Sequence, residues 1–208
     1  MFLKIKYMRK FFFVFALMMV SLLSFADSPL TSTRFYQHYI DNPLVYEASE
    51  THDLSWDMAE YSLDANNPVA IKVAIVNALS WGDKAESNYA GLVSIAMDVK
   101  QPPSASKLFN VLDGKTLICF AYMKALSDYF DLKEALKIAK MAQKKDKDSY
   151  CVNFIAALIQ SQDNFHKEKW KMIYSVLDDV NNTTWRNDDL SDEAAASVME
   201  YINEYRPE

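Results

Sequence analysis

The chain has 208 residues, half of them hydrophobic, with only three glycines and two cysteines, and a formal net charge of −6 at pH 7. The apolar content excludes an intrinsically disordered chain, and glycine far below the usual share of about 7% disfavours a β-rich fold, which needs glycine in turns and bulges. The acidic balance disfavours nucleic acid and anionic membranes as partners, because binding to them depends on lysine and arginine.

Residues 1–26 have the three parts of a secretory signal peptide. The basic residues at the start are Lys4, Lys6, Arg9 and Lys10. An unbroken apolar run over 11–20 follows, and Ser24 and Ala26 are small residues at the two positions read before a cleavage point. The alternative is an uncleaved anchor, but the 16 residues of 11–26 are fewer than the roughly 20 that span a bilayer. We therefore expect a periplasmic or secreted protein that begins near Asp27 and has no stable membrane anchor.

Cleavage would change the charge of the protein. Residues 27–208 carry 18 basic and 28 acidic side chains, a net charge of −10. Their length fits one domain. We expect N-terminal helices over 27–66, repeat-like helix pairs over 67–180 and a capping helix within 181–208.

Helix start and stop signals divide the chain into helices. Asn67 before Pro68 predicts an N-terminus, Asp131 with Glu134 predicts a capping box, and Ser191 predicts the start of the last helix. The predicted helices are 33–41, 43–64, 68–81, 84–99, 104–112, 115–129, 132–144, 149–161, 165–180 and 192–204. Because strict two-residue alternation is absent, the sequence predicts an all-α fold.

One pair of predicted helices has a repeat signature. Its apolar and small positions are Cys119, Tyr122, Met123, Leu126, Ala135, Leu136, Ala139 and Ala142. This pattern resembles a tetratricopeptide repeat, whose period is about 34 residues, with Ala135 as the small residue where the two helices cross. Weaker matches flank this pair, so the resemblance covers about 67–180. It implies stacked antiparallel helix pairs in an α-solenoid, and the alternative is an irregular helical bundle.

The resemblance also implies a partner-binding surface. In this family the first helix of each pair lines a concave face. The matching positions in this chain are Lys72, Val76, Phe120, Lys124 and Ser127. On this interpretation, Lys72 and Lys124 would contact carboxylates of the partner.

Cys119 and Cys151 are the two cysteines of the chain. Each stands six residues before an alanine of the repeat pattern, Ala125 and Ala157, so the resemblance gives both cysteines one register in successive first helices. An exported protein permits a disulfide, and packed helices are close enough for one when the cysteines face each other. The alternative is two buried thiols that act as small apolar side chains.

Motifs for catalysis or metal binding are incomplete. Asp113, Gly114, Lys115 and Thr116 resemble the end of a phosphate-binding loop, but Phe109 stands where the loop needs its first glycine. No serine lies in a G-x-S-x-G turn.

Acidic and imidazole groups gather at one predicted helix end. They are Glu47, Glu50, His52 and Asp53, which follow no zinc or calcium spacing. We interpret them as a solvated helix end and expect neither a metal nor a cofactor.

These observations favour a binding protein over an enzyme. The preferred function is an exported helical-repeat protein that binds a protein or peptide, as a scaffold or adaptor or as an inhibitor or immunity protein. The alternative is a small exported helical hydrolase whose carboxylates come from separate helices. A third class, a carrier of apolar ligands, would need a cavity among the N-terminal aromatic residues.

Overall fold

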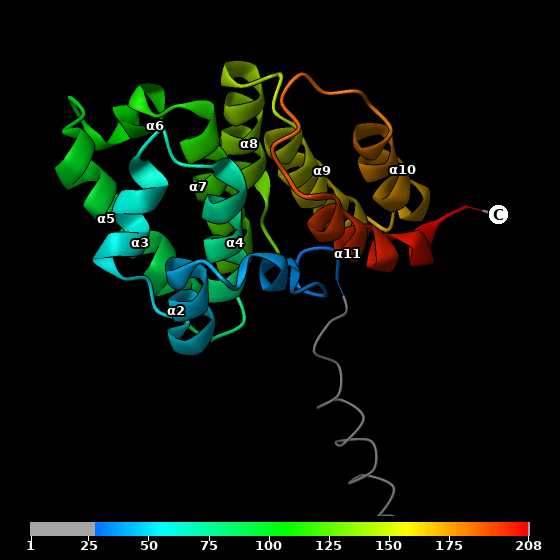
Figure 1. Ribbon diagram of the computed structural model, residues 1–208. Helices are drawn as coiled ribbons and strands as arrows, with labels where there is room; N and C mark the ends of the chain where they lie inside the picture. The colour runs from blue at the N-terminus through cyan, green and yellow to red at the C-terminus, as the bar shows by residue number, and fades with distance from the viewer. Residues whose placement is uncertain (1–27, 208) are drawn as a thin grey trace, which may run out of the picture.

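The computed structural model describes residues 28–207 (Figure 1). The predicted signal peptide over 1–26 lies outside the described residues. The first elements are η1 (Phe35–Tyr39), α2 (Pro43–Thr51), α3 (Trp56–Leu63), α4 (Val69–Leu79) and α5 (Ala85–Lys100). The middle elements are η2 (Ala105–Lys107), α6 (Leu108–Val111), α7 (Gly114–Ser127) and α8 (Lys133–Lys145). The last are α9 (Tyr150–His166), α10 (Trp170–Asn181), α11 (Asp192–Ile202) and η3 (Asn203–Tyr205).

The predicted all-α class is confirmed over 28–207, where the chain forms helices and no strand. Three helices form the centre, namely α4, α7 and α9, and most of their residues are buried. Their near-continuous apolar character is what a helix surrounded by other helices needs. The core of the molecule therefore runs through α4, α7 and α9.

The outer helices are amphipathic instead. α8 buries Ala135, Ile138, Ala139 and Ala142 on one face and exposes lysines on the other. α10 buries Ile173 and Leu177. Spacings of three and four residues place each buried set on one side of its helix.

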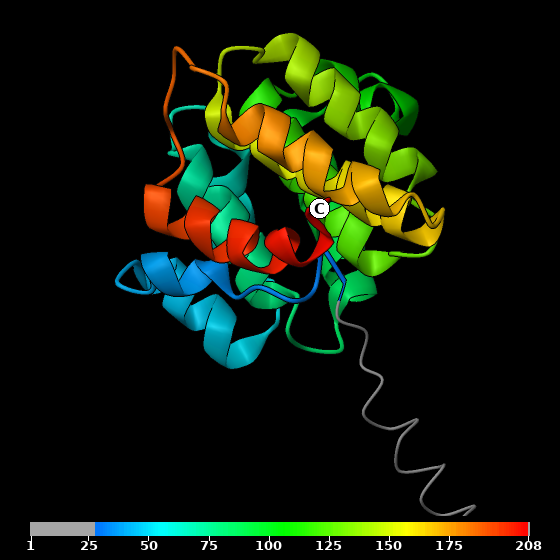
Figure 2. The ribbon, with the colours of Figure 1, turned by 90° about the vertical axis from the view of Figure 1, so that its right-hand side faces the viewer.

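The strongest helix contacts are between chain neighbours, α7 with α8 and α9 with α10. α7 and α8 also both contact α9 (Figure 2). α4 packs mainly on α2 and α7, and α5 packs on α7 and α3. The part of the described chain from α7 to α10 thus contains two packed helix pairs, whereas α4 and α5 do not form a pair of this kind.

Asn77 joins the N-terminal segment to the core. Its Oδ1 accepts a hydrogen bond from the Tyr36 amide (3.1 Å), and its Nδ2 donates to the Thr33 carbonyl (3.1 Å) and to the Tyr122 hydroxyl (3.0 Å). Asn77 and Tyr122 are buried, so each bond also satisfies a group that has lost water. A single side chain on α4 therefore fixes η1 against α7.

The predicted single helix over 43–64 is wrong. His52 adopts a left-handed conformation (φ 51°) and ends α2, and Ser55 starts α3 by accepting a hydrogen bond from the Met58 amide (3.4 Å). A histidine in this conformation is uncommon, and here the imidazole Nδ1 is hydrogen-bonded to the Ala78 carbonyl (3.1 Å). This long-range contact ends the helix where the local sequence favours its continuation.

Two predicted caps also differ. Pro68, not Asn67, is the N-cap of α4, and the side-chain Nδ2 of Asn67 donates to the Tyr61 carbonyl (2.9 Å). The capping box of Asp131 and Glu134 is absent, because Leu132 is the N-cap of α8 and Glu134 pairs with Lys124 on α7 instead. The side chains of Asn67 and Glu134 thus contact neighbouring helices and do not cap the helices for which they were predicted.

Other helix boundaries in the structure differ from the predicted ones by several residues. α9 continues to His166, past its predicted end at 161, and α10 begins at Trp170 rather than 165. Glu168, with φ 54°, makes the turn between them. The predicted helix over 104–112 is divided into the short elements η2 and α6.

The last helix packs beside the first element. Ser191 caps α11 as predicted, accepting from the Ala194 amide (3.3 Å). The Ser191 amide donates to the Tyr39 hydroxyl (2.9 Å), and His38 is hydrogen-bonded to Ser197 (2.6 Å). In Figure 1 this brings the blue N-terminal segment next to the red helix α11.

None of the helices within residues 28–207 combines the length and apolarity that crossing a membrane requires.

Candidate functional site

The segment between α10 and α11 is tied to the helical core. The Trp185 indole donates to the Val180 carbonyl (2.9 Å) at the end of α10. The Tyr150 amide donates to the Asn187 carbonyl (2.9 Å), and the Asn187 amide donates to the Asp148 carbonyl (3.0 Å). These bonds hold the segment as a wall against the start of α9.

Asp189 and Ser191 complete the attachment. The Asp189 carboxylate accepts from the Ser149 hydroxyl (2.8 Å) and the Cys151 amide (2.9 Å), so it satisfies the N-terminus of α9. Asp189 is thus bonded to the start of α9 and not to the last helix, which follows it in the chain. With Ser191 bonded to Tyr39, the segment has anchors on α9, α10 and η1.

An open cleft of about 680 Å³ lies between this wall and α11. α11 lines it with one face: Asp192, Ala195, Ala196, Met199, Glu200 and the following Asn203. The opposite side consists of Tyr150, Asn181, Thr183, Thr184, Trp185 and Asp188. We call this site the α11 cleft.

Small and apolar residues form the base of the α11 cleft. Ala195, Met199 and Tyr150 are buried, and Ala196 is exposed. The rings of Tyr150 and Trp185 lie 6.5 Å apart with a 30° tilt. Since both rings are held by hydrogen bonds, their positions do not depend on a ligand.

The rim of the α11 cleft is negative. Asp188, Asp192 and Glu200 are exposed, and within residues 28–207 none has a basic side chain within ion-pair distance. Burial, and next the charges of Asp188 and Asp192, raise the pKa of Tyr150 to about 12. The Tyr150 hydroxyl is therefore neutral at physiological pH and donates to the Asn181 side chain (2.8 Å).

Fixed aromatic rings beneath unpaired carboxylates suit a cationic group with an apolar stem. A guanidinium or ammonium gains from the carboxylates and from an aromatic face, and its methylenes cover apolar surface. The α11 cleft therefore has the chemistry to hold an arginine or lysine side chain.

The predicted concave face is not formed by the five residues assigned to it. Lys72, Val76 and Phe120 are buried in the core. They lie on faces of α4 and α7 that pack against other helices, so they do not form an open surface in this structure. The repeat pattern placed them on an open surface that this packing closes.

Lys124 and Ser127 do lie together, in a groove of about 580 Å³ between α5 and α7. The Lys124 ammonium is 3.7 Å from Asp128, 3.8 Å from Glu134 and 5.6 Å from the centre of the Tyr89 ring. Lys124 therefore has two carboxylates of its own fold beside it, and its contact with a carboxylate of a partner stays a prediction.

The disulfide that the sequence left open is not formed. Cys119 and Cys151 are both free and fully buried. Burial raises the pKa of both thiols, that of Cys119 to about 12. Both cysteines are therefore small buried residues of the core, as in the alternative interpretation.

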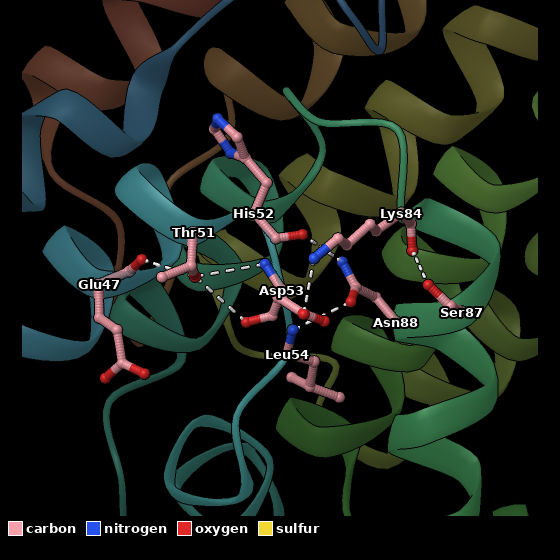
Figure 3. Close-up of polar contacts among 8 residues, drawn as sticks. All are labelled: Glu47, Thr51, His52, Asp53, Leu54, Lys84, Ser87 and Asn88. Carbon is pink, nitrogen blue, oxygen red and sulfur yellow. Dashed lines mark hydrogen bonds and ion pairs between the residues drawn. The ribbon is translucent and has the colours of Figure 1, made fainter.

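The acidic cluster at the end of α2 has structural partners (Figure 3). The Asp53 carboxylate pairs with Lys84 (2.7 Å), and Asn88 donates to the His52 carbonyl (3.1 Å) and accepts from the Leu54 amide (3.0 Å). The imidazole of His52 points away from the carboxylates of Glu47 and Asp53 (Figure 3). Within residues 28–207 no group of three or more histidine, cysteine or acidic side chains is placed to hold a metal ion.

The phosphate-loop resemblance is explained by a helix cap. Asp113 accepts from the Thr116 amide (2.9 Å) and the Thr116 hydroxyl (2.8 Å) at the start of α7. The Thr116 hydroxyl also contacts the Ser62 carbonyl (3.2 Å), so the motif fixes α7 to α3.

No motif in the sequence predicts the α11 cleft. Its residues come from three places in the chain, namely the start of α9, the end of α10 with the segment after it, and α11. One signal was present: Trp185 is a lone aromatic residue in a polar segment that otherwise contains Asn, Thr, Arg and Asp. A tryptophan in such a segment indicates that the segment packs on the fold rather than extending into solvent.

No protein-family model matches the chain, and no curated protein or solved structure matches it either.

Proposed function

We propose that this chain is an exported helical-repeat protein that acts by binding a protein or peptide, and that the α11 cleft receives a basic side chain of that partner. One observation carries the proposal: Asp188, Asp192 and Glu200 have no ion-pair partner among residues 28–207 and line the cleft with the fixed rings of Tyr150 and Trp185. Carboxylates that serve no ion pair in the fold are available to an external cation. Fixed rings lower the ordering cost of binding, so the interaction is favoured further.

The repeat architecture is supported by the order of helix contacts. In a stack of helix pairs, each first helix contacts its own second helix and the next first helix, and each second helix contacts the next first helix. α7, α8, α9 and α10 have this set of contacts. Buried alanines lie where the repeat pattern needs small residues, among them Ala125 and Ala135. We propose two tetratricopeptide-like repeats, with α11 as the cap.

Export is supported by the sequence of residues 1–26. The basic start, apolar run and small residues before Asp27 are in the order of a signal peptide. In such a compartment the partner would be another envelope or secreted protein. N-terminal sequencing of the protein purified from its native source tests this, with Asp27 as the expected first residue.

Binding at the α11 cleft can be tested with short peptides as probes. An amidated peptide with one arginine between glycines is titrated into isotope-labelled protein and followed by amide and indole NMR shifts. The expected shifts centre on the Trp185 indole and the amides of α11. The same peptide with glutamate in place of arginine should cause none, because the rim is negative.

Two variants make the test specific. Asp188→Asn with Asp192→Asn should weaken arginine-peptide binding at least tenfold, since charge-assisted hydrogen bonds contribute about 1.5–3 kcal/mol each. Glu193→Gln is the matched control, because Glu193 is exposed on α11 and does not line the cleft. Equal binding by the double variant, or shifts confined to another surface, would contradict the proposal.

A further inference from the structure

The exposed face of α8 is a row of lysines. Lys133, Lys137, Lys140 and Lys144 are all exposed. At 100° per residue their spacings of four, three and four keep them within about 60° of one another, along about 16 Å of helix. We call this row the lysine ridge.

The lysine ridge makes few ion pairs within the described fold. Lys133 lies 3.6 Å from Asp131, but Lys137, Lys140 and Lys144 have no carboxylate within ion-pair distance among residues 28–207. Like charges three or four residues apart on a helix repel each other. The fold therefore keeps an arrangement that weakens α8.

The rest of α8 supports the ridge as a rigid element. Its one acidic residue, Glu134, is turned towards Lys124 on α7, 3.8 Å away. Its apolar face is buried against α7 and α9 through residues such as Ala135 and Ile138. In Figure 2 the yellow-green helix α8 lies at the edge of the molecule, and the four lysines of the ridge are exposed.

We propose that the lysine ridge binds an anionic phospholipid surface. A straight row of ammonium groups on a convex helix face can meet a flat layer of phosphates with every lysine at once, and the lysine stems can lie along apolar surface while their charges reach the headgroups. Phe130 stands three residues before Lys133, at the N-terminal end of the ridge, and its side chain is 73% exposed. Aromatic side chains at such a position favour the membrane–water interface.

The net negative charge of the protein does not prevent this contact. Electrostatic screening limits interactions between exposed charges to about 8 Å at physiological ionic strength. Carboxylates elsewhere on the molecule are therefore largely screened from a membrane that touches the ridge. The contact is peripheral and reversible.

Vesicle co-sedimentation tests the proposal. The protein without residues 1–26 should bind vesicles of phosphatidylglycerol and phosphatidylcholine at physiological ionic strength. It should not bind pure phosphatidylcholine vesicles, and high salt should release it. The triple variant Lys137→Gln, Lys140→Gln and Lys144→Gln should bind at least tenfold more weakly. Phe130→Ala should weaken binding less.

A control with the same net charge removes basic side chains outside α8, through Lys84→Gln, Lys107→Gln and Arg186→Gln. This control should bind vesicles like the unmodified protein, and circular dichroism should show an unchanged fold for both variants. Equal losses in the two triple variants would assign binding to net charge and overturn the proposal. Failure of the unmodified protein to bind, with retention on immobilised polyglutamate, would assign the ridge to an acidic protein and also overturn it.

Discussion

The burial of Lys72 is not explained by any stabilising contact of its ammonium group within residues 28–207. Its side chain is fully buried on α4, and its Nζ has no hydrogen-bond partner among the described residues. Burial lowers its pKa, while the nearby Cys119 and Asp113 act in the opposite direction. A buried ammonium without a partner is destabilising, so an uncharged side chain at this position should stabilise the fold.

We expect Lys72→Met to raise the free energy of unfolding by about 1–3 kcal/mol, because methionine fills similar space without a charge. Urea denaturation at neutral pH measures this. Lys107→Met, at an exposed position, is the control and should change stability little. A lower stability of Lys72→Met would show that the ammonium has a favourable partner in solution.

The same residue predicts a pH dependence. The pKa of Lys72 in the folded protein lies below the ordinary lysine value of 10.5 that applies after unfolding. Between these two values the unfolded state binds more protons, so the stability of the unmodified protein rises with pH. We expect the advantage of Lys72→Met to shrink as pH rises towards 10.5, and a constant advantage across that range would contradict this account.

At the scale of elements, replacing each of two helical glycines by alanine should change the free energy of unfolding in opposite directions. A Cβ on Gly114, the first residue of α7, would lie 2.5 Å from the Asp146 Cβ and 3.0 Å from the Ala142 carbonyl oxygen. A Cβ on Gly91, within α5, would meet only Leu54, at an ordinary 3.6 Å. The close approach of α7 to the end of α8 therefore requires glycine, and α5 does not.

Gly114→Ala should lower the free energy of unfolding by about 1–3 kcal/mol through the clash. Gly91→Ala should raise it by about 0.5–1 kcal/mol, because alanine favours the helix. Thermal or urea denaturation of the two variants side by side gives the comparison. If both substitutions changed the free energy of unfolding in the same direction, the start of α7 and the end of α8 would be less tightly packed than described.

Local signals predicted the elements better than their ends. Gly82, Pro102 and Ser191 separate helices as expected, because turn-forming and capping residues act on their own neighbours. The break at His52 depends on the Ala78 carbonyl, 26 residues away, and the loss of the capping box depends on Lys124. Such distant partners leave no mark in a window of local sequence.

The whole molecule explains why the predicted surface and the structure disagree. The repeat resemblance predicted an open surface, but whether a helix face is exposed depends on which other helices pack on it. Here the faces of α4 and α7 that carry Lys72 and Phe120 are in the core. The α11 cleft depends on Trp185, Asp189 and Ser191 reaching α10, α9 and η1. A site made by closure of the chain can be located only in three dimensions.

One continuous core joins the helices, which predicts that the molecule opens as a unit. Its buried apolar residues form one cluster from Leu30 to Ile202. Cys119 on α7 and Cys151 on α9 are buried within it and are the two cysteines of the chain. With raised thiol pKa values and no exposure, neither can react with a thiol reagent while the core is closed.

We therefore expect both cysteines to be labelled at the same slow rate in native buffer, and that rate to rise with denaturant in parallel with global unfolding. Mass spectrometry after pulse labelling separates the two sites. Gly114→Ala should accelerate both cysteines equally, because a destabilised core raises the population of the open state. Faster labelling of Cys151 alone would instead mean that α9, α10 and α11 open as a separate unit. In that case the wall of the α11 cleft, which Asp189 joins to the start of α9, would open with them.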